Sequence, residues 1–201
     1  MKARFLVPTL IILFVGCAAM MDHTPVVHSD LKYSQSERDE ASVYKSIIEA
    51  MYVQRGVRLI VVRDKTVPGN SANGQLNEQV RRAANELPLS PETVSDFLQK
   101  NSDRHPLIKS LKLDVDVKQI DESESNQIFL AGTGWEEFYK KYPSSQGVLE
   151  VSKPGFNKDA TQALVYVANQ GSWKSGAGYY VLLLKSNSSW KIAKSYTSWV
   201  S

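Results

Sequence analysis

Residues 161–197, TQALVYVANQGSWKSGAGYYVLLLKSNSSWKIAKSYT, decide the fold class. Three segments favour β-strands (residues 161–169, 179–185 and 190–197), because β-branched, aromatic and other apolar residues dominate them. The Ser-Asn-Ser link at 186–188 is short and polar, which is typical of an antiparallel hairpin. Residues 164–167 and 179–184 are apolar on both faces of their strands, so the sheet needs cover on both sides, with helices on one of them.

Three further strands are predicted upstream of this block. Residues 148–152 precede a polar turn at 157–159, and residues 57–62 form a β-branched run. Residues 111–120 alternate between apolar and charged positions, which indicates a strand with one solvated face. The charged positions are Lys112, Asp114, Asp116 and Lys118.

Helices are predicted over residues 34–54, 76–87, 91–98 and 134–142. Ser34 and Glu37 have the spacing of a capping box, and Ser90-Pro91 supplies an N-cap followed by proline at the first helical position. In the last helix Trp135, Phe138 and Tyr139 are expected to point inward. The sequence therefore predicts an α+β domain over residues 34–201, with N-terminal helices packed on a mainly antiparallel C-terminal sheet.

Composition excludes one class of function. The chain has 201 residues, 42% of them hydrophobic, with 24 basic and 21 acidic residues. Removal of Lys2 and Arg4 with a leader peptide leaves 22 basic residues against 21 acidic ones. A nucleic-acid-binding protein shows a clear basic excess or a basic stripe, and we therefore expect no nucleic-acid partner.

The N-terminus has the pattern of an export signal. Lys2 and Arg4 precede residues 5–15, which are almost all apolar. Eleven residues are too few to cross a hydrocarbon core as a helix, which takes about 20. Residues 1–16 are therefore predicted to be a signal peptide.

The stretch Phe14-Val15-Gly16-Cys17 resembles the lipobox of bacterial lipoprotein signals, with Phe14 in place of the usual leucine. The resemblance implies that Cys17 receives a diacylglyceryl group and becomes the new N-terminus. Cys17 is also the single cysteine of the chain, so no intramolecular disulfide competes for it. Ala18, where some lipoproteins carry aspartate, implies the periplasmic face of the outer membrane rather than the inner membrane.

Residues 17–33 are polar and aperiodic, and we expect them to be the lipidated tether. A flexible segment of this length spans roughly 20–25 Å on average. His23 and His28 lie here and are interpreted as loop residues rather than metal ligands.

The body of the chain resembles a group of bacterial exported or lipoprotein-like proteins of unknown function. The resemblance covers roughly residues 35–201 and is strongest after residue 134. Its matching stretches are residues 135–139 (WEEFY), 155–159 (GFNKD), 162–167 (QALVYV), 178–183 (GYYVLL), 190–192 (WKI) and 199–201 (WVS). That group often carries a Cys-x-x-x-Cys pair where this chain has Gly171 and Ser175. The resemblance implies no activity.

The glycine-rich segment 169–178, NQGSWKSGAG, is the strongest candidate for a contact site. Its glycines permit unusual backbone angles or close approach by another group. Trp173 and Lys174 at its centre are candidate partner contacts, since tryptophan is enriched at interface hot spots. In the competing interpretation Trp173 folds back onto the sheet. The four tryptophans (135, 173, 190 and 199) either line a ligand groove or pack in the core.

Other side chains give no catalytic or metal site. His105 stands without a G-x-S-x-G motif, so a serine triad is not expected. Asp114 and Asp116 share a strand face, but Lys112 and Lys118 flank them and balance their charge. Asp121, Glu122 and Glu124 form an acidic turn that lacks EF-hand spacing. Glu136 and Glu137 open a helix, where acids are favoured by the helix dipole. No cofactor is expected.

The sequence therefore predicts a non-enzymatic lipoprotein of the cell envelope, held on the membrane through lipid on Cys17 and acting as a binding or interaction module, with an envelope protein as the candidate partner. Two alternatives stay open. One is an envelope hydrolase that uses carboxylates the sequence does not place. The other is an inhibitor-like or immunity-like protein that acts through the loop at residues 171–178.

Overall fold

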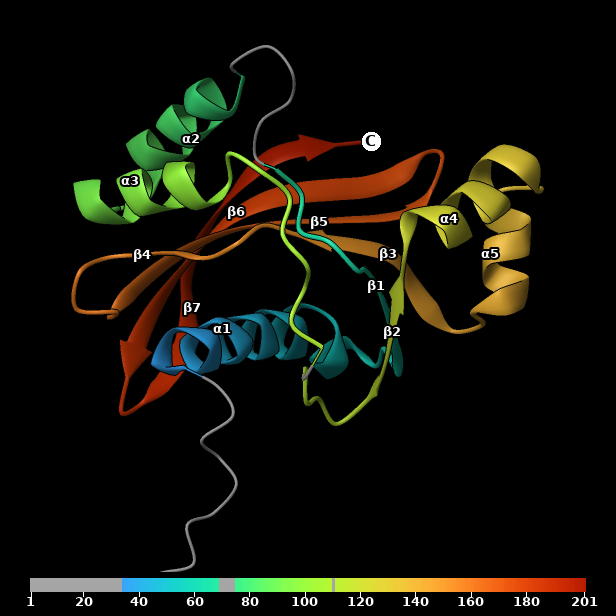
Figure 1. Cartoon of the computed structure of the whole chain (residues 1–201), viewed down its shortest axis with the longest axis horizontal. Coiled ribbons are helices and arrows are strands. Elements are labelled where there is room, and N and C mark those ends of the chain that lie inside the picture. Colours follow the sequence, from blue (N-terminus) through green and yellow to red (C-terminus); the bar gives the residue numbers. More distant parts are fainter. Residues whose placement is uncertain (1–33, 69–74, 110) are drawn as a thin grey trace, which may run out of the picture. The chain divides into compact units, whose positions relative to one another are not determined.

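A computed structural model describes residues 34–68, 75–109 and 111–201, which fall into one compact unit (Figure 1). The predicted signal peptide, Cys17 and the tether lie outside the described residues. No helix in the described ranges is long and apolar enough to cross a membrane.

The predicted α+β class is confirmed by a seven-stranded, mostly antiparallel sheet with helices packed on it. The strand order is β2-β1-β3-β5-β6-β7, and the short β4 pairs with β5. Only β1 is parallel to its neighbours, β2 and β3. The strands are β1 (Leu59–Arg63), β2 (Asp116–Ile120), β3 (Ser145–Val151), β4 (Gly155–Phe156), β5 (Gln162–Ser172), β6 (Ser175–Ser186) and β7 (Ser189–Val200).

The helices begin where the sequence places N-caps. Ser34 and Glu37 form the predicted capping box of the first helix, and Ser90 caps the third. Asp121, predicted to lie in an acidic turn, caps a helix that the sequence did not reveal, and its carboxylate accepts from Glu124 N at 2.7 Å. The helices are α1 (Gln35–Met51), η2 (Val53–Arg55), α2 (Gln75–Glu86), α3 (Pro91–Lys100), α4 (Glu122–Asn126), η3 (Gln127–Ala131) and α5 (Trp135–Lys141).

Three local predictions were wrong. Residues 111–115 lie outside β2. Asp116 already pairs with Leu59, the first residue of β1, so β1 offers no partner for the residues before Asp116. The segment 169–178 is mostly strand, since β5 and β6 leave only Trp173 and Lys174 as the turn. Tyr139 is 37% exposed rather than inward, and its hydroxyl donates to Gly171 O at 2.7 Å.

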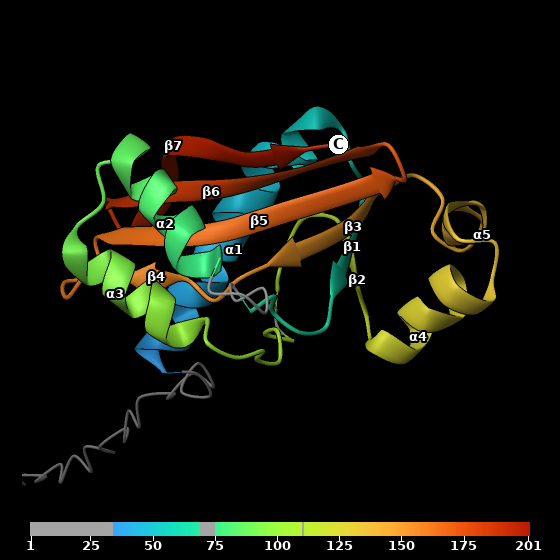
Figure 2. The same ribbon diagram turned by 90° about the horizontal axis from the view of Figure 1, so that it is seen from above.

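Helices cover both faces of the sheet. On one face α1 buries Val43, Tyr44, Ile47 and Ile48 against the central strands. On the other face α2 and α3 cover β5 and β6 through Phe97, Leu164 and Leu182. The α4–α5 segment covers β1 and β3 on this second face through Val61, Phe138 and Val148. Figure 2 shows these two helix groups, α2–α3 and α4–α5, at opposite ends of the sheet.

Two buried acids fix α1 to the sheet. Asp39 bonds Lys185 at 2.5 Å and accepts from Trp190 Nε1 at 3.3 Å. Burial alone raises the pKa of Asp39, but hydrogen bonds from Gln35, Lys185 and Trp190 outweigh it and hold the pKa below its ordinary value. The stabilisation from Asp39 is therefore present above the ordinary aspartate pKa, and it is lost as the pH falls through the lowered one.

Glu40, the next residue, bonds Lys153 at 2.7 Å and lies 3.1 Å from the buried Tyr44 hydroxyl. This hydroxyl also donates to the carbonyl of Ser152 at 2.9 Å. The Tyr44 hydroxyl therefore connects α1 to Ser152, the residue after β3, through groups that are almost fully buried.

A bulge interrupts the pairing of β1 with β3. The register shifts between Leu59 and Val61, and the Gln146 side chain fills the gap. Its amide accepts from Val61 N at 3.3 Å and donates to Val61 O at 3.0 Å, in place of a backbone partner. The next residue, Gly147, has φ of +100°, and a Cβ there would lie 2.2 Å from Gln170 O. The bulge therefore brings the backbone of β3 very close to β5.

Candidate functional site

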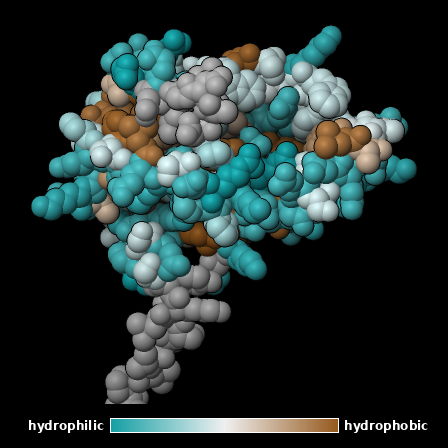
Figure 3. All heavy atoms as spheres, turned by 45° about the horizontal axis from the view of Figure 1, so that its top comes forward, coloured by the Kyte–Doolittle hydropathy of each residue, from teal (hydrophilic) through white to brown (hydrophobic). Residues whose placement is uncertain are grey.

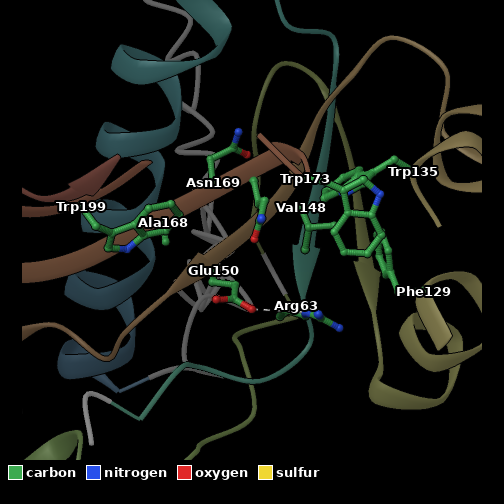
Figure 4. Close-up of a pocket in the computed structure, with 10 residues that line it drawn as sticks. Arg63, Phe129, Trp135, Val148, Glu150, Ala168, Asn169, Trp173 and Trp199 are labelled. Carbon is green, nitrogen blue, oxygen red and sulfur yellow. Dashed lines mark ion pairs between the residues drawn. The ribbon is translucent and has the colours of Figure 1, made fainter. Parts of the chain in front are cut away.

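A cavity of about 160 Å³ lies on the second face of the sheet, and we call it the tryptophan pocket (Figure 4). Its walls carry three of the four tryptophans, and its floor is formed by β1, β3 and β5. The lining residues are Arg63, Phe129, Trp135, Val148, Glu150, Ala168, Asn169, Gln170, Trp173 and Trp199.

Strand register sets the floor of the pocket. Glu150 of β3 pairs with Ala168 of β5, and Val148 pairs with Gln170. Because side chains alternate between faces along a strand, these four residues share the second face. Arg63 at the end of β1 reaches Glu150 through an ion pair of 3.4 Å, drawn dashed in Figure 4. Both side chains are partly exposed, so the pair adds little stability.

Trp199 of β7 forms one wall. A Cβ on Gly178 would lie 2.2 Å from Trp199 Nε1, and one on Gly176 would lie 3.1 Å from its ring. Trp199 Nε1 donates to the Tyr166 hydroxyl at 2.7 Å. These glycines, which belong to the segment 169–178, therefore let an indole lie against the sheet. Close approach was one of the two uses of the glycines that the sequence allowed. Neither Gly176 nor Gly178 has a positive φ.

The opposite wall is aromatic and comes from η3, α5 and the β5–β6 turn. Trp135 lies between Phe129 and Trp173, at centroid distances of 4.8 and 6.4 Å. Trp173 packs its edge over Gly134, where a Cβ would lie 3.1 Å from it, yet Trp173 stays 68% exposed. Trp135 Nε1 is buried and has no hydrogen-bond partner. This wall therefore offers apolar surface to the pocket.

Exposed apolar surface continues on the helices of this wall. Leu130, which follows the wall residue Phe129, is 79% exposed. Figure 3 shows a mostly hydrophilic surface with several hydrophobic patches, one of them at the right of the view in the region of α4 and α5. Leu130 and Trp173 are two of the five exposed large hydrophobic side chains among the described residues.

The structure separates the two predicted contact residues. Trp173 lines the tryptophan pocket, whereas Lys174 lines a groove of about 700 Å³ with Arg55, Tyr179 and Ser195. The two adjacent residues therefore serve different surfaces. Trp190 is buried beneath α1, so core packing is correct for this tryptophan. The other three line the tryptophan pocket, and Trp135 also packs against the core.

Most of the remaining candidates have structural partners. The ring of His105 lies 3.0 Å from the carbonyl of Lys100, to which its Nε2 donates. Glu124 contacts Lys141 at 2.5 Å and the Tyr142 hydroxyl. Glu137 accepts from Thr133 N at 3.4 Å, and Asp114 and Asp116 are exposed. In the described ranges no group of three or more His, Cys, Asp or Glu side chains is placed to share a metal ion.

Sequence reasoning missed Arg63 and Glu150. Arg63 looked like an ordinary charged residue after a strand and Glu150 like one within a strand, and no motif connects them. An arginine directly after the apolar run 59–62 was the available signal.

Comparison with protein-family models, with curated proteins and with solved structures gave no match. The resemblances noted from the sequence therefore stay predictions.

Proposed function

We propose that the protein is a membrane-anchored lipoprotein of the cell envelope that binds a ring-sized apolar group in the tryptophan pocket. The observation that carries this proposal is a cavity of about 160 Å³ walled by Trp135, Trp173 and Trp199. An apolar cavity of about 150 Å³ is large enough to bind benzene. An exposed tryptophan on its rim is typical of binding surfaces.

The pocket lies far from the point where the chain enters the domain. Asp39, near the start of α1, bonds Lys185 at the end of β6, whereas Trp173 precedes the start of β6. Twelve residues of β6 separate these ends by roughly 35 Å. Figure 1 shows α1 beginning at the end away from the β5–β6 turn. A domain tethered before Ser34 therefore holds its pocket away from the attachment point, where an envelope partner has access.

The pocket favours binding over hydrolysis. Glu150 is its single carboxylate, and Arg63 pairs with it. A serine triad requires a histidine, and the described lining residues of the pocket include none.

Trp173→Ala is expected to weaken binding of indole to the full-length protein at least tenfold, because it removes one aromatic wall. Ligand-observed NMR with indole as the probe measures the change. Lys174→Ala is the matched control, since it alters the other residue of the turn, and its affinity is expected to stay within twofold. Unchanged affinity in Trp173→Ala would overturn the proposed site.

Cys17→Ser is expected to move the protein out of the membrane fraction or to leave its leader uncut, because it removes the proposed acceptor of lipid. Fractionation and the mass of the N-terminal peptide measure both outcomes. Ala18→Asp is the control, since it keeps Cys17 and is expected to change only the membrane that holds the protein. A normally cut, membrane-bound Cys17→Ser protein contradicts the anchor.

A further inference from the structure

A second cavity, of about 220 Å³, adjoins the tryptophan pocket, and Arg63 and Glu150 line both. We call it the charged pocket. Its other ionisable lining residues are Asp64, Lys65, Arg104 and Glu122, and Ser125 and Asn126 complete it. The two cavities therefore meet at the Arg63–Glu150 pair, and we call them together the cleft, with an aromatic part and a charged part.

The charged pocket contains three cations and three anions. Within the described residues, Arg63–Glu150 is the single ion pair that any of the six forms, and its distance of 3.4 Å joins only one guanidinium nitrogen, Nε, to the carboxylate. Asp64, Lys65, Arg104 and Glu122 have no ion-pair partner there. A small cavity with unpaired groups of both signs is complementary to a ligand that itself carries both signs.

We infer that the cleft binds an aromatic amino acid with a free ammonium and a free carboxylate. This inference rests on the proposed function, because the ring occupies the tryptophan pocket. The carboxylate then faces Arg63 and Arg104, and the ammonium faces Glu150 and Asp64. Arginine favours carboxylates because its planar fork can donate two parallel hydrogen bonds.

The positions of Arg63 and Glu150 and of the residues after Arg63 support this orientation of the ligand. Arg63 and Glu150 belong to adjacent regions of β1 and β3, so a ligand between the two cavities meets both signs at once. Asp64 and Lys65 follow Arg63 directly, and their backbone is held by bonds to Ile120 and Leu107 and by a bridge to Pro106. The backbone that carries Asp64 and Lys65 is therefore fixed.

The test is a series of four ligands on the full-length protein in detergent, with calorimetric affinities. Tryptophan carries both charges, and N-acetyltryptophan amide carries neither. Tryptophan amide lacks the carboxylate, and N-acetyltryptophan lacks the ammonium. Tryptophan is expected to bind at least tenfold tighter than the doubly capped form, with the other two between them. A peptide-terminal residue as the true ligand would instead make one singly capped form equal to tryptophan, which overturns the inference of a free amino acid.

Arg63→Gln is expected to make the affinities for tryptophan and tryptophan amide equal. Glu150→Gln is expected to make the affinities for tryptophan and N-acetyltryptophan equal. Lys158→Gln, at an exposed turn, is the control and is expected to keep both differences in affinity. Equal binding of tryptophan and its doubly capped form overturns the inference and leaves the proposed function intact. If neither indole nor any member of the series binds, the proposed function fails as well.

Discussion

Gly147→Ala is expected to lower the free energy of unfolding by about 3–5 kcal/mol, as the sum of backbone strain and a clash. Gly147 has φ of +100°, which disfavours any L side chain. The new Cβ would also lie 2.2 Å from Gln170 O and 2.7 Å from Gly171 Cα. Both are backbone atoms of β5, so the strand itself must move to accommodate the methyl group.

Gly56→Ala separates the two causes. Gly56 has φ of +92°, but its added Cβ meets nothing within 4 Å. We expect a loss of about 1–2 kcal/mol from strain alone. Urea unfolding followed by tryptophan fluorescence gives both values. Equal losses in the two variants would show that β3 and β5 are not as close as the structure has them.

Glu40→Ala is the second substitution with a large expected effect, a loss of about 3–5 kcal/mol. Glu40 is 6% exposed, bonds Lys153 at 2.7 Å and lies next to the buried Tyr44 hydroxyl. Removing the carboxylate leaves a half-buried ammonium without its partner, and this desolvation cost accounts for the size of the loss.

Glu49→Ala on the same helix is the control for this prediction. Its pair with Lys45 is a partly exposed i,i+4 contact of 3.4 Å, which is worth about 0–1 kcal/mol. Thermal unfolding by circular dichroism compares the variants. A loss of under 1 kcal/mol for Glu40→Ala would mean that the Glu40–Lys153 contact does not fix α1 to the sheet.

The sequence predicted most elements of the fold, because hydrophobic period and caps are local signals. The Ser34 capping box and the Ser90-Pro91 start appear where expected, and so does the β6–β7 turn. The α4–η3 segment was missed, since the three acids at its start, Asp121, Glu122 and Glu124, also fit a turn. The parallel pairing of β1 was not visible either, because it depends on contacts between distant segments.

The site was only partly predictable. Trp173 was singled out because an aromatic residue stood in a glycine-rich turn. Trp135 and Trp199 join it only through the packing of α5 and the register of β7, which no local pattern reveals. Lys174, adjacent to Trp173, is on a different surface because the two-residue turn directs the pair to opposite sides of the hairpin.

The most direct test of the tryptophan pocket is an NMR titration that follows the four indole N–H signals of the ¹⁵N-labelled protein. On addition of indole or tryptophan, the signals of Trp135, Trp173 and Trp199 are expected to shift and saturate together. Trp190, buried beneath α1, is expected to stay in place. Shifts of all four signals alike, or of none, would contradict the account.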